Sequence, residues 1–177
     1  MEFSEVVKKR RSIRKYKDRE VEKEKIEKII DAGRRAPSGY NAQPWEFVVV
    51  TNKTKKKRIR EIYDKSGEKA GSYKQETTFL ENGTLIIVIG DRTKMTHIQS
   101  CSAAIENMLL SATDLGLGSL WTMRAITYEE DRKEIKKLFG ILENFEIVGI
   151  IVIGYGDEIP QEKERRKLED IVHWERF

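Results

Sequence analysis

Three arginines and a serine lie within five residues near the start of the chain, in the sequence Arg10-Arg-Ser-Ile-Arg14. If this stretch is extended, side chains two residues apart share a side, so Arg10, Ser12 and Arg14 face one way. Guanidinium and hydroxyl groups bind phosphate oxygens through charge-assisted hydrogen bonds. The spacing therefore predicts a phosphate-binding cradle with Arg11 beside it, although a basic run taken alone is more often a solvated helix end.

A turn-rich loop between Pro37 and Pro44 is the second candidate. Gly39 permits a positive φ, and Asn41 and Gln43 each carry donor and acceptor groups. Such a loop can bind the polar edge of a planar heterocycle. Out of context, the same composition is typical of an ordinary connection between a helix and a strand, with Asn41 bonding its own backbone.

The third candidate is the sequence Trp121-Thr-Met-Arg124, which follows Gly116-Leu-Gly118. The end of a strand can present backbone groups and the Thr122 hydroxyl to a ligand. Core packing by Trp121 and Met123 is the competing interpretation, and without further context it is the more typical one.

Motifs of several other classes of protein are missing from the sequence. Neither Gly116-x-Gly118 nor Gly154-x-Gly156 has the third glycine of a dinucleotide-binding fingerprint, and there is no Walker loop. Two histidines and one cysteine are too few for a structural zinc site, and no triad for nucleophilic catalysis is visible. Cys101 falls on the apolar stripe of an expected helix, so we expect it in the core.

Hydrophobic periodicity predicts the elements that must position the candidate residues. The expected helices cover residues 3–10, 22–35, 53–64, 96–115 and 127–138, and the expected strands cover residues 46–51, 84–90, 119–123 and 146–154. Thr96 and Thr127 fit the capping-box pattern and are the expected N-caps. Residues 65–78 are polar without a clear period, so we expect a flexible segment there. Helices that separate nearly continuous apolar strands indicate a sheet covered by helices, of the α+β or α/β class.

Length and composition restrict the class of protein further. The chain has 177 residues, 38% of them hydrophobic, which is the size of one domain with a real core. A single cysteine excludes an internal disulfide framework and fits a reducing, cytoplasmic location. Every apolar stretch is far below the roughly 18 residues of a membrane span, and none follows the N-terminal basic cluster as in a secretory signal. The net charge is a mild +4, with basic clusters at residues 8–14, 53–60 and 163–167.

Five segments, taken in order, resemble the FMN-dependent nitroreductase family. They are Arg10-Arg-Ser-Ile-Arg14, Pro37-Ser-Gly-Tyr-Asn-Ala-Gln-Pro-Trp45, Ala103-Ala-Ile-Glu-Asn107, Gly116-Leu-Gly-Ser-Leu-Trp121 and Leu168-Glu-Asp-Ile-Val-His-Trp174. The resemblance spans nearly the whole chain and implies one domain over residues 1–177. The implied fold is an α+β sandwich, in which helices flank a mixed, mostly antiparallel sheet. The resemblance also implies an obligate homodimer with two FMN sites at the interface, a core over about residues 5–156 and a tail, 157–177, that reaches the partner.

The same resemblance assigns cofactor-binding residues. It places the FMN phosphate on Arg10, Ser12 and Arg14, with Arg11 adjacent and a tail contact from Arg165, helped by Lys163 or Arg166. It places Pro37, Ser38, Gly39 and Asn41 of the other subunit against the isoalloxazine, with Gln43 close by. It places Trp121, Thr122, Met123 and Arg124 along the second face of the flavin, near N5. It assigns no catalytic acid or base and no metal.

The activity that the resemblance implies is that of an NAD(P)H oxidoreductase. NAD(P)H would reduce the flavin at N5 and leave, and a nitroaromatic, quinone or similar acceptor would then enter the same pocket in a ping-pong scheme. Arg14 or Arg124 near the N1–C2=O edge would favour the anionic reduced flavin. Residues 65–83 leave room for only a short cover over the site, so the physiological acceptor stays open, as does the choice between NADH and NADPH.

Two hypotheses of other classes remain beside this one. The chain could be a flavin carrier or sensor without turnover, or a basic nucleic-acid-binding domain that uses the N-terminal arginines and Lys53–Arg60. The second hypothesis lacks an interleaved aromatic platform. We therefore expect no nucleic-acid or membrane partner, and a homodimer that acts on small molecules.

Overall fold

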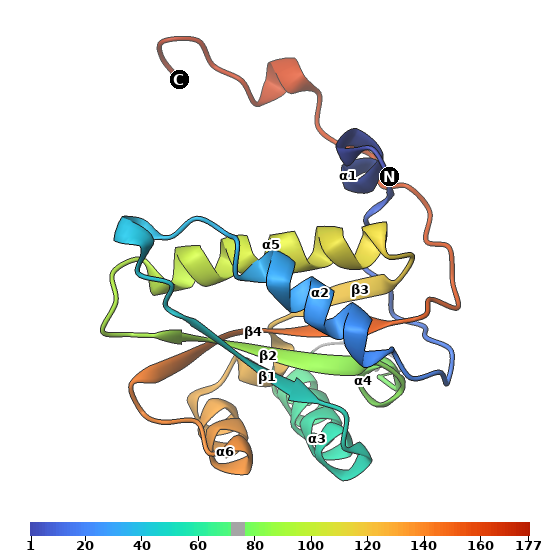
Figure 1. The fold of residues 1–177 in the computed structure, drawn as a ribbon, viewed down its shortest axis with the longest axis vertical. Helices are drawn as coiled ribbons and strands as arrows, with labels where there is room; N and C mark the ends of the chain where they lie inside the picture. Colours follow the sequence, from blue (N-terminus) through green and yellow to red (C-terminus); the bar gives the residue numbers. More distant parts are fainter. Residues whose placement is uncertain (72–76) are drawn as a thin grey trace.

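A four-stranded sheet forms the middle layer of the protein (Figure 1). The computed structural model describes residues 1–71 and 77–177. The strands β1 (Trp45–Val50), β2 (Thr84–Asp91), β3 (Gly118–Thr122) and β4 (Phe145–Gly154) pair in the order β1-β2-β4-β3, each antiparallel to its neighbour. The central strands β2 and β4 are β-branched runs buried on both faces, because helices cover the sheet on each side. The predicted α+β class is confirmed.

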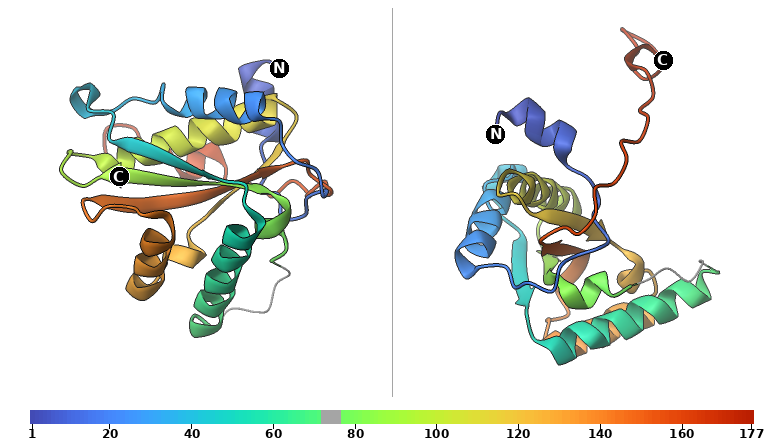
Figure 2. Two further views of the ribbon diagram at one scale, coloured as in Figure 1. Left: turned by 60° about the horizontal axis from the view of Figure 1, so that its bottom comes forward. Right: turned by 90° about the vertical axis from the view of Figure 1, so that its right-hand side faces the viewer.

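Two helices, α2 (Lys23–Gly33) and α5 (His97–Asp114), cover one face of the sheet (Figures 1 and 2). Their apolar stripes and the inward side chains of the sheet form one buried cluster. The two helices pack closely because Gly33 has no side chain: a Cβ at this position would lie 2.7 Å from Cγ of Met108. The long helix α5 therefore lies between α2 and the sheet.

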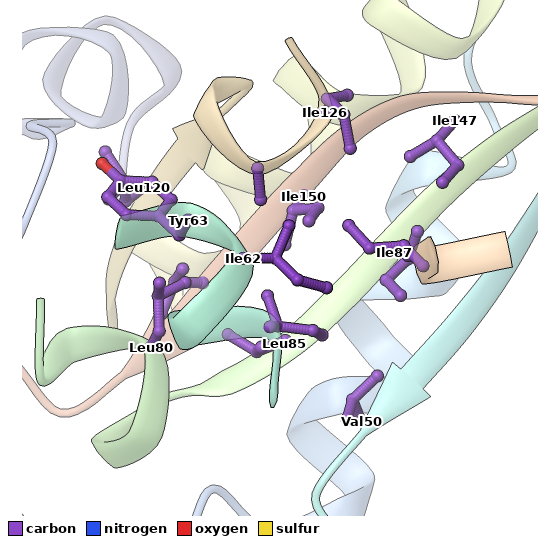
Figure 3. Close-up of a cluster of buried hydrophobic side chains, with 14 of the residues drawn as sticks. Val50, Ile62, Tyr63, Leu80, Leu85, Ile87, Leu120, Ile126, Ile147 and Ile150 are labelled. Atoms are coloured by element: carbon purple, nitrogen blue, oxygen red, sulfur yellow. The ribbon is translucent and has the colours of Figure 1, made fainter. Parts of the chain in front are cut away.

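Helices α3 (Lys53–Lys69), α4 (Phe79–Asn82) and α6 (Glu129–Phe139) cover the other face, together with the 3-10 turn η2 (Arg124–Ile126). A second buried cluster fills this layer, and Figure 3 shows side chains from α3, α4 and η2 gathered over β2 and β4. The two clusters on opposite faces explain why the strands are continuously apolar.

Helix α3 continues to Lys69, past the predicted end at Asp64. The extra turn is stabilised by tertiary contacts: the hydroxyl of Ser66 donates to Asp131 at 2.5 Å, and Lys69 pairs with Glu130 at 2.7 Å. The prediction of a non-helical segment from residue 65 was therefore wrong for its first part. Its central residues, 72–76, lie outside the described residues.

Thr96 is the residue that opens α5, as predicted, but it has a left-handed φ of 56° and its side chain makes no cap hydrogen bond. The prediction that Thr127 caps α6 was wrong. Thr127 belongs to the end of the η2 turn, where its hydroxyl donates to the carbonyl of Met123 at 3.4 Å, so that Tyr128 is the residue before α6. In both cases the preceding turn sets the backbone geometry, which a four-residue pattern does not describe.

In Figure 1 both ends of the chain lie above α5, on the side away from α3 and α6, and apart from each other. Helix α1 (Phe3–Lys9) packs at the C-terminal end of α5, where the N-terminal amine pairs with Asp114 at 2.7 Å. The tail after Gly156 extends away from the body, with a short 3-10 turn η3 (Leu168–Asp170) and side chains that are nearly all exposed. The first residues of the tail contact the N-terminal segment through Glu158 and Glu162, and the residues after them are exposed.

Gly149 in β4 makes room for an indole ring, which leads to a stability prediction. A Cβ at this position would lie 2.3 Å from Nε1 of Trp121 and 3.1 Å from Cδ1 of Ile105, both inside the core. We expect Gly149→Ala to lower the free energy of unfolding by about 1–3 kcal/mol, as overpacking does. Urea denaturation followed by circular dichroism measures the change. Gly156→Ala is the matched control, because its Cβ would meet its nearest neighbour at 3.5 Å, and a loss as large as that of Gly149→Ala would contradict the steric explanation.

A polar network holds the end of β4 to the start of α2. The hydroxyl of Tyr155 donates to Glu22 at 2.6 Å and accepts from Lys25 at 2.8 Å, while the guanidinium of Arg19 stacks on the ring at 3.8 Å. The hydrogen bond from Tyr155, followed by contacts with the backbone, Arg19 and Lys25, lowers the pKa of Glu22 from 4.5 to about 2.

The lowered pKa of Glu22 predicts an acid sensitivity. A carboxylate with a depressed pKa stabilises the fold above its ordinary pKa, and this contribution is lost as the pH falls through the folded value. We expect the melting temperature to fall between pH 4.5 and about 2, and Glu22→Gln to make that fall shallower. Glu24→Gln removes a charge from the first turn of α2 and should leave the dependence of the melting temperature on pH as in the wild type. The same dependence in the wild type and both variants would refute the assignment of the acid sensitivity to Glu22.

Candidate functional site

The basic N-terminal segment, residues 10–16, is held along the outer edge of β3. The amide of Ile13 donates to the carbonyl of Ser119 at 2.9 Å, and Ser12 forms a parallel bridge with Ser119. Ile13 and Tyr16 are buried in the core, and the hydroxyl of Tyr16 donates to the carbonyl of Ile13 at 2.9 Å. Burial raises the pKa of Tyr16, so this hydroxyl stays protonated. Two apolar anchors thus fix a segment that is otherwise basic and exposed.

The arginines of this segment point in different directions. Nε of Arg10 lies 3.6 Å from a carboxylate oxygen of Glu106 on α5. Arg11 faces the tail, where Nη2 lies 2.9 Å from Glu162, and Nη1 donates to the carbonyls of Arg10 and Lys8 at the end of α1. Arg11 therefore closes the end of α1 and contacts the tail.

Nη1 of Arg14 donates to the backbone carbonyl of Ser12 at 3.5 Å, and the side chains of both residues are exposed. Beside them the hydroxyl of Ser119 is buried and has no hydrogen-bond partner within residues 1–71 and 77–177. The exposed guanidinium of Arg14 and the exposed hydroxyl of Ser12 are donors of the kind that bind a phosphate.

The loop that follows α2 has a strained backbone. Tyr40, Asn41 and Gln43 all have positive φ values of 53°, 54° and 43°, although none of them is glycine. The hydroxyl of Ser38 accepts a hydrogen bond from the amide of Gln43 at 3.1 Å, which closes the loop around the 3-10 turn η1 (Gly39–Asn41). Strain of this kind costs about 1–3 kcal/mol per residue and is concentrated at functional sites.

The loop and the basic segment lie at opposite ends of α5 (Figure 1). A Cβ at Gly39 would lie 3.1 Å from the hydroxyl of Thr96, just before α5, whereas Arg10 contacts Glu106 within α5 and Ser12 lies beside Ser119, after its end. Ten helical residues separate Thr96 from Glu106, which is about 15 Å along the helix axis. One chain therefore does not bring Arg10 and Arg14 together with Asn41 and Gln43.

The end of β3 holds the third group of predicted residues. Thr122 is buried and Met123 is half exposed, whereas the indole of Trp121 packs against Gly149 with its Nε1 buried and unpartnered in the described part of the chain. The guanidinium of Arg124 stacks on the ring of Tyr63 in α3, at 4.7 Å from its centroid. Met123 is thus the residue of this group whose side chain is most accessible.

The tail residues Arg165 and Arg166 are exposed and do not reach the basic segment of their own chain. Nη2 of Arg166 donates to the carbonyl of Asp170 at 2.6 Å, within the tail itself. Figure 1 shows the tail leaving the body, so a phosphate contact from these residues is not formed inside one chain.

Sequence reasoning missed three carboxylates that touch the basic segment. Glu106 pairs with Arg10, Glu162 pairs with Arg11, and Glu158 accepts a hydrogen bond from the amide of Arg14 at 2.5 Å. Glu106 lies inside a segment that carries the family resemblance, but the two tail glutamates belong to a polar run with no local signal. Only the fold brings residues 158–162 next to residues 11–14.

Within the described ranges, no helix is long and apolar enough to cross a bilayer.

Comparison with known proteins gives matches over nearly the whole chain. A family model described as the nitroreductase family matches residues 7–155. A protein of Archaeoglobus fulgidus, named provisionally as an NADH dehydrogenase/NAD(P)H nitroreductase, is 38% identical over 95% of this chain and 94% of its own length.

Two solved structures have the same fold along their whole length. An FMN-dependent nitroreductase from Clostridium difficile is 36% identical, with a TM-score of 0.78 over 97% of this chain and 98% of that one. A nitroreductase with bound FMN from Bacteroides fragilis is 26% identical, with a TM-score of 0.81 over 98% of each chain.

Proposed function

Because the chain belongs to the nitroreductase family, we propose that it is an FMN-dependent NAD(P)H oxidoreductase of the nitroreductase type. The observation that carries this proposal is the exposure of the Ser12 and Arg14 side chains on a segment that is bridged to Ser119 at the edge of the sheet, which supplies donors for a phosphate. The expectation of FMN is confirmed at the level of the family, since relatives with this fold are FMN-dependent or hold FMN.

Each group of predicted residues has a separate task in this proposal. Arg10, Ser12 and Arg14 bind the phosphate of the cofactor, and the end of β3 with Met123 lies along its ring. FMN supplies hydride transfer at N5, taking a hydride from NAD(P)H and passing it to a nitroaromatic, quinone or similar acceptor in a ping-pong cycle. The protein positions the ring, excludes water from one face and leaves the other open.

The proposal includes a homodimer, because the site is incomplete in one chain. The loop with Ser38, Asn41 and Gln43 lies at the start of α5, whereas the basic segment lies beside Ser119, beyond its end. If a two-fold axis passed between α5 and the α5 of the partner, the loop of each subunit would lie against the basic segment of the other. The dimer would then contain two equivalent sites. The exposed tail with Arg165 and Arg166 would then extend over the partner.

Two alternatives predict different behaviour. The nucleic-acid-binding hypothesis loses support from α3, where Arg58 pairs with Glu61 and Glu134 and buried Lys56 donates to backbone carbonyls. A flavin carrier without turnover would bind FMN equally well but would not pass electrons to an acceptor.

Anaerobic reduction of the purified, flavin-loaded protein tests the proposed function. We expect NADH or NADPH to bleach the flavin absorbance, and menadione or a nitroaromatic to restore it over repeated cycles. Bleaching without reoxidation by any acceptor would indicate a carrier or sensor. A protein that cannot take up added FMN would refute both flavin-based functions.

A further inference from the structure

The guanidinium of Arg124 lies against helix α3, just beyond the end of β3. Its central carbon is 4.7 Å from the centroid of the Tyr63 ring. A Cβ at Gly67, one turn further along α3, would lie 3.3 Å from both Cδ and Nη1 of Arg124. The missing side chain of Gly67 therefore leaves the space that the arginine occupies.

The surface beneath Arg124 is held in place by the core. Tyr63, labelled in Figure 3, is buried, and its ring meets the ring of Phe79 edge to face, with 5.6 Å between the centroids. The last turn of α3 is fastened to α6 by the hydrogen bond from Ser66 to buried Asp131. Arg124 is therefore preorganised, so it loses little side-chain freedom when it binds a partner.

This guanidinium is not neutralised by the protein. Among the residues that the structure describes, no carboxylate lies within ion-pair distance of Arg124. Other arginines of the same layer are paired: Arg58 lies 2.6 Å from Glu61, and Arg132 lies 2.9 Å from Glu129. An aromatic face attracts a cation without using the N–H donors in the guanidinium plane. The half-buried Arg124 thus keeps a planar fork of donors, which matches a carboxylate.

The position of Arg124 along β3 separates it from the proposed phosphate contact. Ser12 is bridged to Ser119 near the start of the strand, and Thr122, about 10 Å further along, ends it. Met123, which we place along the flavin ring, follows directly and is 49% exposed. Arg124 therefore lies at the ring end of the proposed site, where an electron acceptor would bind.

We propose that Arg124 binds a carboxylate on the electron acceptor, so that the enzyme prefers nitroaromatics or quinones that carry such a group. This inference rests on the proposed function, because it places the acceptor beside Met123. The carboxylate pairs with the guanidinium through two parallel N–H···O bonds, and the ring of the acceptor lies against the end of β3. Arg124 selects and orients the acceptor and takes no part in the transfer of the hydride.

The test compares compounds of one shape that differ in charge. With the flavin-loaded, full-length protein, kcat/KM is measured for NADH-dependent reduction of para-nitrobenzoate and para-nitrobenzamide. Calorimetry measures the binding of benzoate and benzamide, which are not reduced. In Arg124→Gln we expect the preference for the charged compound to fall about tenfold in both measurements. Arg58→Gln, which removes a paired arginine from α3, should leave both preferences within about twofold of the wild type.

The outcomes separate this inference from the proposed function. A protein that takes up no FMN, or that reduces no acceptor, overturns the proposed function and the inference with it. If the protein is active and Arg124→Gln keeps the wild-type preference, only the role of Arg124 is overturned. If menadione is reduced but neither nitro compound is, the binding of benzoate and benzamide decides in the same way.

The extra phosphate of NADPH is the other anion that could meet Arg124. The ratio of the KM values of NADPH and NADH is therefore measured in the same variants. A change in this ratio, with an unchanged preference for carboxylates, would overturn the assignment to the acceptor. Should Arg124→Gln fail to fold by circular dichroism, Arg124→Lys carries the test, because it keeps the charge and loses the planar fork. We expect about a threefold fall there, and an unchanged preference overturns the inference.

Discussion

Replacing Arg10 and Arg14 together by alanine should lower the affinity of the protein for FMN by at least about 100-fold while the chain stays folded. Each arginine contributes a charge-assisted hydrogen bond worth about 1.5–3 kcal/mol, and a factor of 100 corresponds to about 2.8 kcal/mol. Neither side chain belongs to a hydrophobic cluster, since the segment is anchored by Ile13 and Tyr16. Fluorescence titration with FMN measures the affinity, and circular dichroism measures the fold.

A second double variant separates a local effect from a general loss of positive charge. Arg58→Ala with Arg92→Ala removes two exposed arginines from α3 and from the turn after β2. We expect this control to bind FMN as tightly as the wild type. Stoichiometric flavin in the Arg10 and Arg14 variant, or equal losses in both variants, would contradict the phosphate assignment.

Two inactive variants should restore activity to each other when they share a dimer. Each proposed site takes Arg10 and Arg14 from one subunit and Asn41 and Gln43 from the other. A heterodimer of the Arg10→Ala, Arg14→Ala chain with an Asn41→Ala, Gln43→Ala chain therefore has one site with both defects and one with none. We expect each homodimer to lose about 10-fold or more of its activity, and the heterodimer to recover about half of the wild-type value.

The heterodimer is prepared by coexpression of the two chains with different affinity tags and purification on both. NADH-dependent reduction of menadione measures its activity, beside the two homodimers at equal concentration. A heterodimer no more active than the homodimers would mean that both groups act within one subunit. In that case the loop and the basic segment of one chain, which lie apart along α5, would have to form a single site. The result would therefore overturn the arrangement proposed here.

The sequence predicted most of the fold because the elements are strongly patterned. The strands β2 and β4 are long apolar runs, and α5 has apolar residues on several sides, so their types and places are confirmed. The start of α5 after Thr96 is confirmed without the expected cap hydrogen bond, whereas α6 starts after Tyr128, because Thr127 takes its backbone geometry from the turn before it. The end of α3 depends on Ser66 and its contact with buried Asp131, which are far apart in sequence.

The candidate site was predicted in part for similar reasons. An alternating pattern predicted that Ser12 and Arg14 share a side, but it could not tell that Arg11 would turn to the tail and pair with Glu162. The carboxylate of Glu158 reaches Arg14 across 144 positions of sequence, and only the folded chain creates that contact. The assignment of the loop and tail residues to a partner's site stays a prediction, since it concerns contacts between two chains.

A crystal structure of the protein grown with FMN tests the central claim most directly. We predict two chains in each assembly, with the phosphate of FMN within hydrogen-bond distance of Arg10, Ser12 and Arg14 of one chain. The ring should lie against the end of β3 and under the loop from Ser38 to Gln43 of the other chain. Arginines that face bulk solvent, with FMN bound elsewhere or not at all, would contradict the account.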